Sequence, residues 1–452
     1  MNDGQAGERR GFGTRCVHAG AEPDPATGAR APPIHQTTSY VFEDADGAAD
    51  LYALDAEGDI YSRFDNPTVA TLERRLADLE GGTAAVATGS GMAALDAATS
   101  ILAASGDNVV SAASLYGGTH TYFATMASRR GVEVRFVDTL DPEAYAEAID
   151  DDTAYVHCET LANPSLVTPD IEAVADVAHD HGVPLFVDNT FATPALCRPL
   201  ERGADIVWES TTKWLHGSGT TVGGVLVDGG SFPWGEHPER FPEVGGENSA
   251  FGVTFAERFG DRALAVAARQ RAVRSLGDGQ KPFDAWQTMQ GVETLDLRME
   301  RHCENAMAVA EHLRDHPDVA WVTYPGLAGH ETHDAAGEYL EGGYGGMVTF
   351  GLEGGYEAGK TLCEETDLAQ FLANVGDART LVIHPASTTH AQLSEEEQRE
   401  SGVTPDLVRL SVGIEDIDDI IADLDRAIER ANGAGGPDST RADSDADTAG
   451  ER

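Results

Sequence analysis

The 452-residue sequence predicts an α/β protein built around a mostly parallel sheet. From about residue 80, short apolar runs alternate with helical stretches of about ten to fifteen residues, which is the pattern of βαβ units. A hydrophobic content of 41% with 7% aromatic residues is typical of a globular protein with substantial cores. Ligands of parallel sheets bind beyond the carboxyl ends of the strands, so residues that follow apolar runs are the first candidates for a site.

The elements follow this alternation in order. Strands are expected at 83–88, 108–111, 132–137, 153–157, 183–187 and 205–208. Helices are expected from residue 91 to about 104 and at 119–129, 142–149 and 171–181. A second α/β unit is expected to hold a helix at 292–314, strands at 347–350 and 407–412, and a last helix at 417–431.

The chain divides into four stretches by composition. Residues 1–66 form an extended N-terminal arm with few periodic segments, and residues 67–288 form a large domain. That domain contains an insertion at about 229–262, rich in Gly, Pro, Glu and Phe. Residues 289–431 form a smaller C-terminal domain, and the acidic tail 432–452 is expected to be disordered.

The charge of the chain is strongly acidic. The formal net charge is −46, from 77 acidic and 31 basic residues, which excludes binding to the phosphate backbone of nucleic acids. Only three lysines are present: Lys213, Lys281 and Lys360. Excess carboxylate with depleted lysine is expected of a halophilic protein, which stays hydrated in concentrated salt. Apolar periodic segments through most of the chain argue against the alternative, an acidic disordered protein.

The compartment is expected to be the cytoplasm. No run of about eighteen apolar residues exists, so no membrane span is expected, and the polar N-terminus lacks an apolar signal core. The five cysteines are scattered, odd in number and without metal-binding spacing, so we interpret them as reduced thiols.

Lys213 is the first candidate for catalysis. Arginine cannot replace a catalytic amine, because its guanidinium stays charged. A lysine that is kept in a lysine-poor chain is therefore a candidate for a catalytic role. Lys213 follows a predicted strand, and the nearby hydroxyls of Ser210 and Thr212 can hydrogen-bond a phosphate. The alternative is a surface lysine after a strand, which is our interpretation of Lys281 and Lys360.

Asp188 ends another apolar run, at the expected ligand edge of the sheet. A carboxylate there can keep a pyridine nitrogen protonated, which makes the ring an electron sink. The alternative is an Asp that caps a helix or a turn.

A glycine-rich turn, Gly89-Ser90-Gly91-Met92-Ala93-Ala94, follows the first strand and opens a helix. Free N–H groups and the helix dipole make an anion site there. The spacing also fits a dinucleotide fingerprint, but the next strand ends at Ser111-Ala112 without the required acid. We therefore expect a single phosphate rather than NAD, with a purely structural turn as the alternative.

Four further residues are candidates with ordinary alternatives. Tyr116 follows a strand and could stack on a cofactor ring or simply pack. Tyr61 and Arg63, in the arm, suit a phosphate but are also common surface residues. Arg409 lies inside an apolar strand, where it is either a structural ion pair or a clamp for a substrate carboxylate.

Together these motifs resemble the Cys/Met-metabolism family of pyridoxal-phosphate (PLP) enzymes, over about residues 12–432. The resemblance implies PLP fold type I, the aspartate-aminotransferase-like fold. It implies that Lys213 holds PLP as a Schiff base, that Asp188 pairs with the pyridine nitrogen and that Tyr116 stacks on the ring. The remaining implied contacts are Gly91, Met92, Ser210 and Thr212 with the phosphate, Tyr61 and Arg63 with the phosphate of a neighbouring subunit, Asn163 with the cofactor hydroxyl, and Arg409, helped by Asn374, with the substrate carboxylate.

The subfamily is indicated by other segments. Residues 34–38, 232–235, 293–302, 374–379 and 384–390 look like those of O-acetylhomoserine sulfhydrylases. The activity that this implies is replacement at Cγ, converting O-acetyl-L-homoserine and sulfide to L-homocysteine and acetate. A homotetramer with sites shared across a dimer interface is also implied.

Other activities remain open at this point. Cystathionine γ-synthase, cystathionine γ-lyase and methionine γ-lyase would use the same cofactor, although methionine γ-lyases usually have Cys where Gly118 stands. A non-catalytic binding protein on this fold would be expected to have lost Lys213, Asp188 and Arg409.

Overall fold

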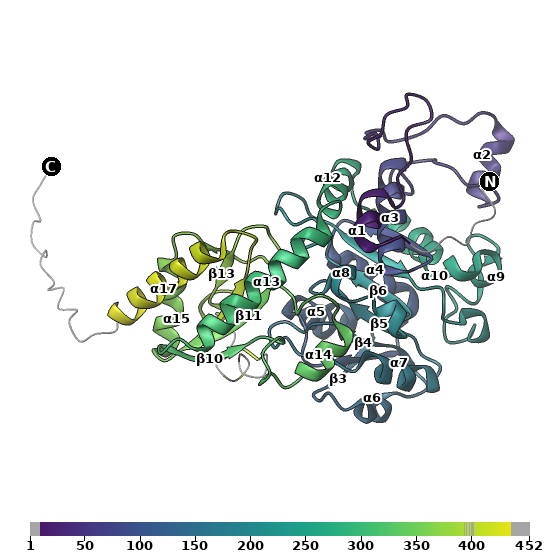
Figure 1. Ribbon diagram of the computed structural model, residues 1–452. Coiled ribbons are helices and arrows are strands. Elements are labelled where there is room, and N and C mark those ends of the chain that lie inside the picture. Colours follow the sequence, from purple (N-terminus) through teal and green to yellow (C-terminus); the bar gives the residue numbers. More distant parts are fainter. Residues whose placement is uncertain (1–9, 393, 395, 397, 399–401, 435–452) are drawn as a thin grey trace, which may run out of the picture.

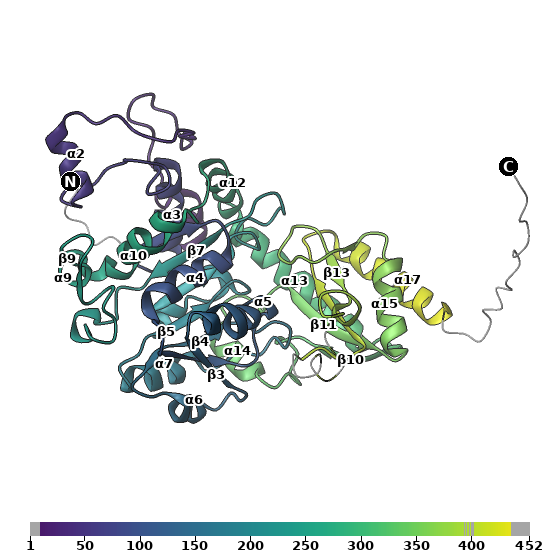
Figure 2. The ribbon, with the colours of Figure 1, turned by 180° about the vertical axis from the view of Figure 1, so that it is seen from behind.

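The computed structural model describes residues 10–392, 394, 396, 398 and 402–434. Two lobes, each with its own sheet, are joined by the long helix α13 (Leu295–Arg314) (Figures 1 and 2). The predicted α/β architecture with a mostly parallel central sheet is confirmed.

The large domain is built on a seven-stranded sheet with the order β1-β7-β6-β5-β4-β2-β3. Its strands are β1 (Ala84–Thr88), β2 (Asn108–Ala112), β3 (Glu133–Val137), β4 (Thr153–Glu159), β5 (Leu185–Asp188), β6 (Ile206–Glu209) and β7 (Gly224–Asp228). Strand β7 runs antiparallel to both its neighbours, and the other pairs are parallel. The carboxyl ends of β4, β5 and β6 therefore meet at one edge.

Helices cover both faces of this sheet, so the strands are apolar on both sides. The first face packs on α3 (Pro67–Glu80), α7 (Ile171–Asp180) and α12 (Pro282–Val292). The second packs on α4 (Gly91–Leu102) and α10 (Ala263–Ala267). The remaining helices of the domain are α5 (Gly117–Thr121), α6 (Pro142–Ala148), α8 (Thr193–Leu196) and α11 (Arg274–Leu276).

Two predicted boundaries shift in a way that matters for the site. Strands β5 and β6 end one residue later than predicted, so Asp188 and Glu209 are their last residues. The helix predicted over 292–314 is α13, which begins three residues later than predicted, at Leu295, because Thr294 is outside the helical backbone conformation (φ −113°).

The N-terminal segment contains two short helices that the sequence pattern did not indicate. Helix α1 (Phe12–His18) packs on α3, where Arg15 is ion-paired with Asp78. Helix α2 (Ala45–Tyr52) has no buried residue and projects from the large domain (Figure 1). The exposed part of the arm therefore lies after α1.

The segment 229–262 covers the α4 face of the large domain. It contains β8 (Glu247–Asn248), β9 (Val253–Thr254) and α9 (Phe255–Phe259). Phe232, Trp234 and Phe241 are buried in the same cluster as Phe186 and Trp208 of the central strands.

The small domain has a five-stranded sheet with the order β10-β11-β14-β13-β12. The strands are β10 (Val319–Thr323), β11 (Met347–Leu352), β12 (Gln370–Phe371), β13 (Leu381–Ile383) and β14 (Leu407–Ser411). Helices α13, α15 (Gly355–Glu365) and α17 (Ile417–Ala434) pack on this sheet, and α14 (His333–Tyr339) lies toward the large domain. Helix α17 ends three residues beyond the predicted 431, and the rest of the tail, 435–452, lies outside the described residues.

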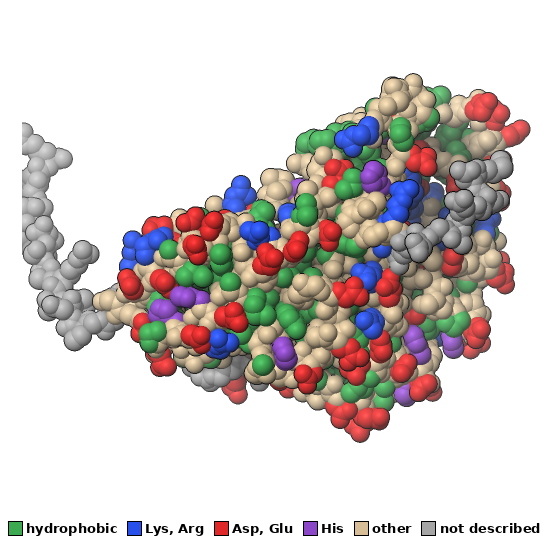
Figure 3. Space-filling model, viewed as in Figure 1, with side chains coloured by type: hydrophobic (Ala, Val, Ile, Leu, Met, Phe, Trp, Pro, Cys, Tyr) green, Lys and Arg blue, Asp and Glu red, His purple; other side chains and the backbone are tan. Residues whose placement is uncertain are grey.

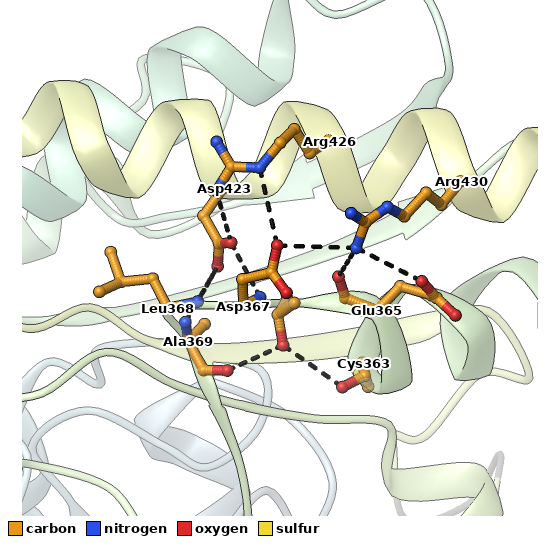
Figure 4. A network of polar contacts seen from close by, with 9 residues as sticks. Cys363, Glu365, Asp367, Leu368, Ala369, Asp423, Arg426 and Arg430 are labelled. Atoms are coloured by element: carbon orange, nitrogen blue, oxygen red, sulfur yellow. Dashed lines mark hydrogen bonds and ion pairs between the residues drawn. The ribbon is translucent and has the colours of Figure 1, made fainter.

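A buried aspartate ties α17 to the small domain (Figure 4). The Asp423 carboxylate accepts the backbone N–H groups of Asp367, Leu368 and Ala369 at 2.9, 3.0 and 2.9 Å. Arg426 donates to the same carboxylate at 3.0 Å. Every oxygen of this carboxylate is thus satisfied by the protein itself.

The surface carries the acidic excess. Asp and Glu side chains are spread over the face seen in Figure 3. Within the described chain, no helix combines the length and the apolar character that crossing a bilayer requires.

Candidate active site

Carboxylates gather at the carboxyl edge of the large sheet. Glu159 ends β4 and is the register partner of Asp188 at the end of β5. Because side chains alternate along a strand, Glu159 and Asp188 lie on the α4 face, together with His157, Phe186 and Trp208. Glu209, at the end of β6, lies on the opposite face.

Asp188 is buried but incompletely bonded. Its side chain is 7% exposed, and its hydrogen-bond partners within the described chain come from Thr190 alone, whose backbone N–H donates at 2.9 Å. Burial raises the pKa of this carboxyl to about 7. A cationic partner would restore its charge, so Asp188 is prepared to receive one.

The Lys213 amine lies in the site, as the sequence predicted for a functional lysine. Its Nζ donates to Asn374 Oδ1 at 2.6 Å. Burial, and the positive charge of Arg409, lower its pKa to about 8. The amine is therefore easier to deprotonate than an exposed lysine, which is what a nucleophile or base requires.

Asn374 is held there by a glycine turn. Gly376 adopts φ +77°, and a Cβ at this position would lie 2.5 Å from the backbone N of Trp214 and 2.9 Å from the carbonyl carbon of Lys213. Only glycine permits both the dihedral angle and the approach. The turn thus brings the small domain against the Lys213 backbone. Asn374 was expected beside Arg409, but its described contact is with Lys213.

An anion cradle lies next to this lysine. Helix α4 begins at Gly91, with Ser90 as its N-cap, whose hydroxyl accepts from Ala93 N–H at 3.1 Å. The N–H groups of Gly91 and Met92 have no described acceptor. A Cβ on Gly91 would lie 2.9 Å from Ser210 Cβ, so Ser210 faces this helix start closely. Two free N–H groups and a hydroxyl suit a phosphate.

Thr212 makes different contacts. Its hydroxyl donates to the carbonyl of Gly223 at 3.2 Å and accepts from the N–H of Gly223 at 3.0 Å. Contact with a phosphate would compete with these bonds, so Thr212 stays a predicted ligand.

Arg409 is a partly buried cation with no acidic partner in the described part of the chain. It donates to Asn163 Oδ1 at 3.4 Å, and no carboxylate of the described chain pairs with it. Burial lowers its pKa to about 10. Of the two alternatives for Arg409, the structural ion pair is absent from the described residues, which favours a clamp for a ligand carboxylate.

Tyr116 lies beside Arg409 at the start of α5 and is 45% exposed. Tyr61 and Arg63 make their described contacts elsewhere. The Arg63 guanidinium donates to the carbonyl of Arg274 and lies over the ring of Phe64 at 4.9 Å. Both arm residues are exposed, and none of their described contacts is with the Lys213 group.

Two further residues belong to this site and were not among the predicted ones. Glu159 accepts the backbone N–H of Tyr116 at 2.6 Å and that of Asn163 at 3.1 Å. The imidazole Nε2 of His390 lies 3.7 Å from the Cβ position of Gly117, and its pKa is lowered by burial and by Arg409. His390 lies in the segment 384–390, and Glu159 lies four residues before Asn163. A single sequence does not show which residues of such segments point into the site.

Comparison with known proteins agrees with this geometry. Residues 13–429 match the family model for Cys/Met metabolism PLP-dependent enzymes. The chain belongs to this family. It is 50% identical to a homocysteine synthase of Schizosaccharomyces pombe, over 94% of this chain and 99% of that protein. It is 49% identical to an O-acetyl-L-homoserine sulfhydrylase of Thermus thermophilus, over 92% and 99%.

A solved structure is similar throughout. The Campylobacter jejuni protein described as an O-acetylhomoserine (thiol)-lyase superimposes with a TM-score of 0.87 at 37% identity, over 92% of this chain and 99% of that one. That crystal carries a pyridoxyl-lysine 5′-monophosphate. The fold of this PLP-dependent enzyme is therefore confirmed.

The residues of the site fit PLP, the cofactor of this family. Asp188 offers an unmatched buried carboxylate for a pyridinium, and the start of α4 offers unmatched N–H groups for a phosphate. Lys213 offers a partly buried amine close enough to Arg409 for that charge to lower its pKa. Among the described residues, no cation pairs with Asp188 and no acceptor is bonded to the N–H groups of Gly91 and Met92, and the cofactor would supply both.

Proposed function

We propose that this enzyme replaces the acetate of O-acetyl-L-homoserine by sulfide, forming L-homocysteine, with its cofactor on Lys213. The observation that carries the proposal is the combination of a partly buried, low-pKa amine with a partly buried Arg409 that has no carboxylate partner among the described residues. The names of the relatives, homocysteine synthase and O-acetyl-L-homoserine sulfhydrylase, support this substrate class.

PLP, when bound, supplies an electron sink that stabilises negative charge at the substrate Cα. Asp188 would keep the ring nitrogen protonated, and the helix start at Gly91 and Met92, with Ser210 and Thr212, would hold the phosphate. Asn163 would serve the ring hydroxyl, and Tyr116 would pack on the ring.

Lys213 moves the protons of the reaction. Burial and Arg409 lower the pKa of its Nζ to about 8, so the neutral form is more accessible near neutral pH than for an exposed lysine. It takes the Cα proton and later returns it. Asn374 holds the amine in place by accepting its hydrogen bond at 2.6 Å.

Arg409 orients the substrate by its α-carboxylate. A guanidinium donates two parallel hydrogen bonds to a carboxylate, which fixes the Cα–H bond relative to Lys213. Because Arg409 has no acid of its own in the described chain, substrate binding neutralises a buried charge.

Tyr61 and Arg63 complete the site of a second copy in this proposal. Both side chains are exposed and neither has a described contact with its own Lys213 group, which supports a role across a dimer interface. The working unit is then at least a dimer, and a tetramer of two such dimers is the assembly we expect.

The glycine at position 118 disfavours methionine γ-lyase activity. A side-chain carbon on Gly118 would lie 2.3 Å from the ring of Tyr116, so the cysteine typical of those lyases requires a different ring position.

The test is a competition between sulfur donors. The holoenzyme, in concentrated salt, is given O-acetyl-L-homoserine with equimolar sulfide and cysteine, and the products are separated. Homocysteine as the main product is expected. Cystathionine as the main product would move the enzyme to the cystathionine γ-synthases, and an untouched substrate would contradict chemistry at Cγ.

A further inference from the structure

Glu159 is a buried acid, and each of its two carboxylate oxygens accepts a backbone N–H of a residue in the site. Oε1 accepts the N–H of Tyr116 at 2.6 Å, and Oε2 accepts the N–H of Asn163 at 3.1 Å. The side chain is 4% exposed. One carboxylate therefore holds the backbone of the residue proposed to stack on the ring and of the residue proposed to contact its hydroxyl.

This geometry favours the ionised carboxylate. A protonated carboxyl would turn one oxygen into a donor, and both oxygens already face N–H donors. Burial and the neighbouring Asp188 raise the pKa of Glu159 well above its usual value, and the two N–H groups oppose this only in part, so a cation beside the acid pair is needed to keep Glu159 ionised. The titratable groups around it are Asp188 on β5, Cys158 on its own strand and Tyr116 before α5, and none of them is a cation.

Glu159 and Asp188 form an acid pair across neighbouring strands. They are register partners on the same face of the sheet, where adjacent strands lie about 4.8 Å apart. A negative charge so close strengthens the preference of this edge for a cation, because two carboxylates in a dry site cannot both stay ionised without one.

We propose that Glu159 is a positioning residue of the cofactor site: it fixes the backbones of Tyr116 and Asn163, and its charge reinforces Asp188 in holding the proton on the ring nitrogen. This inference rests on the proposed placement of the cofactor and deepens it. The proposal has two parts that can be tested separately. The Glu159 side chain must be long enough to contact both backbone N–H groups, and it must carry a negative charge.

The experiment loads Glu159→Gln and Glu159→Asp with ¹⁵N-labelled PLP, without substrate. The ring-nitrogen chemical shift and the cofactor dissociation constant are measured. In Glu159→Gln, which loses the charge and one acceptor, the ring signal should move toward its unprotonated value, and binding should weaken about tenfold or more. In Glu159→Asp, which keeps the charge but loses reach, the ring signal should stay near wild type while binding weakens.

Asp228→Asn is the matched control. Asp228 is 2% exposed and also accepts one backbone N–H on each oxygen, from Gly230 and Ala265, both at 3.0 Å. It ends the reversed strand β7 and so lies at the opposite edge of the sheet. Its replacement should lower stability and leave both readouts unchanged.

The outcomes decide the matter. Wild-type ring signal and wild-type affinity in Glu159→Gln would overturn the proposal, as would equal shifts in Asp228→Asn. If Glu159→Gln does not fold, weakened binding with an unchanged ring signal in Glu159→Asp supports the proposal, and unchanged binding overturns it. A wrong cofactor placement is recognised separately, because wild-type enzyme would then carry no cofactor on Lys213.

Discussion

Two buried aspartates, one in each domain, differ in how completely the protein hydrogen-bonds their carboxylates. Asp423 in the small domain accepts three backbone N–H groups and an arginine (Figure 4). Asp188 in the large domain has hydrogen-bond partners from Thr190 alone among the residues that the structure describes. A buried carboxylate without partners is costly to fold, so one that persists indicates that its partner comes from outside the chain. The contrast separates a structural acid from a functional one.

The largest expected effect of breaking this contrast is at Asp188. Asp188→Asn keeps the shape but cannot hold a proton on the ring nitrogen, so kcat/KM should fall by about 10²–10⁴-fold, the range for losing proton control at a reacting group. Far-UV circular dichroism should be unchanged. A variant with nearly full activity would show that this carboxylate is not the functional acid.

The reciprocal change is Asp423→Asn, which should affect stability. Three backbone N–H groups would compete for one amide oxygen, so the free energy of unfolding should fall by about 3–5 kcal/mol. Denaturant unfolding in concentrated salt measures it. At temperatures where the variant stays folded, kcat/KM should match wild type. A large loss of kcat/KM would contradict a purely structural role for Asp423.

A pH series sharpens the comparison further. The folded cofactor-free protein holds Asp188 with its pKa raised to about 7, so its contribution to stability is present at low pH and is lost as pH rises through about 7. With the cofactor bound, the pyridinium supports the ionised form and this loss disappears. The difference in Tm between holo and cofactor-free protein should therefore widen from pH 5 to pH 8. In Asp188→Asn the widening should be absent, and a constant difference in wild type would contradict the argument.

The smallest effect concerns the arm. If Arg63 serves a neighbouring site, Lys213→Ala and Arg63→Ala subunits, each nearly inactive, should form mixed dimers with one intact site. Co-expression should then recover about a quarter of wild-type activity, given random pairing into symmetric dimers. Recovery of nothing would place Arg63 outside the shared site.

Much of the fold could be predicted from the sequence because the central strands of the large sheet are apolar on both faces and form continuous apolar runs. Sequence reasoning missed β7 and the helices of the N-terminal segment, and in the small domain it missed β10, β12, β13, α14 and α15. Strand β7 is reversed and follows a glycine-rich loop, and α1 is short and gains its stability from packing on α3.

The site was predictable where a residue type is chemically unusual. Lys213 stands out in a lysine-poor chain, and Arg409 stands out in an apolar strand. Glu159 did not stand out, because an acid at the end of a strand resembles a turn residue until its two backbone partners are seen. The contact of Asn374 with Lys213 depends on the docking of one domain against the other, which no local pattern encodes.

The central claim, that the cofactor is held on Lys213, can be tested directly because the chain has only three lysines. Holoenzyme is reduced with borohydride, digested and mapped by mass spectrometry. The account predicts a pyridoxyl phosphate mass on the peptide that contains Lys213 and none on those with Lys281 or Lys360. Modification at either of the other two, with Lys213 unmodified, would contradict it.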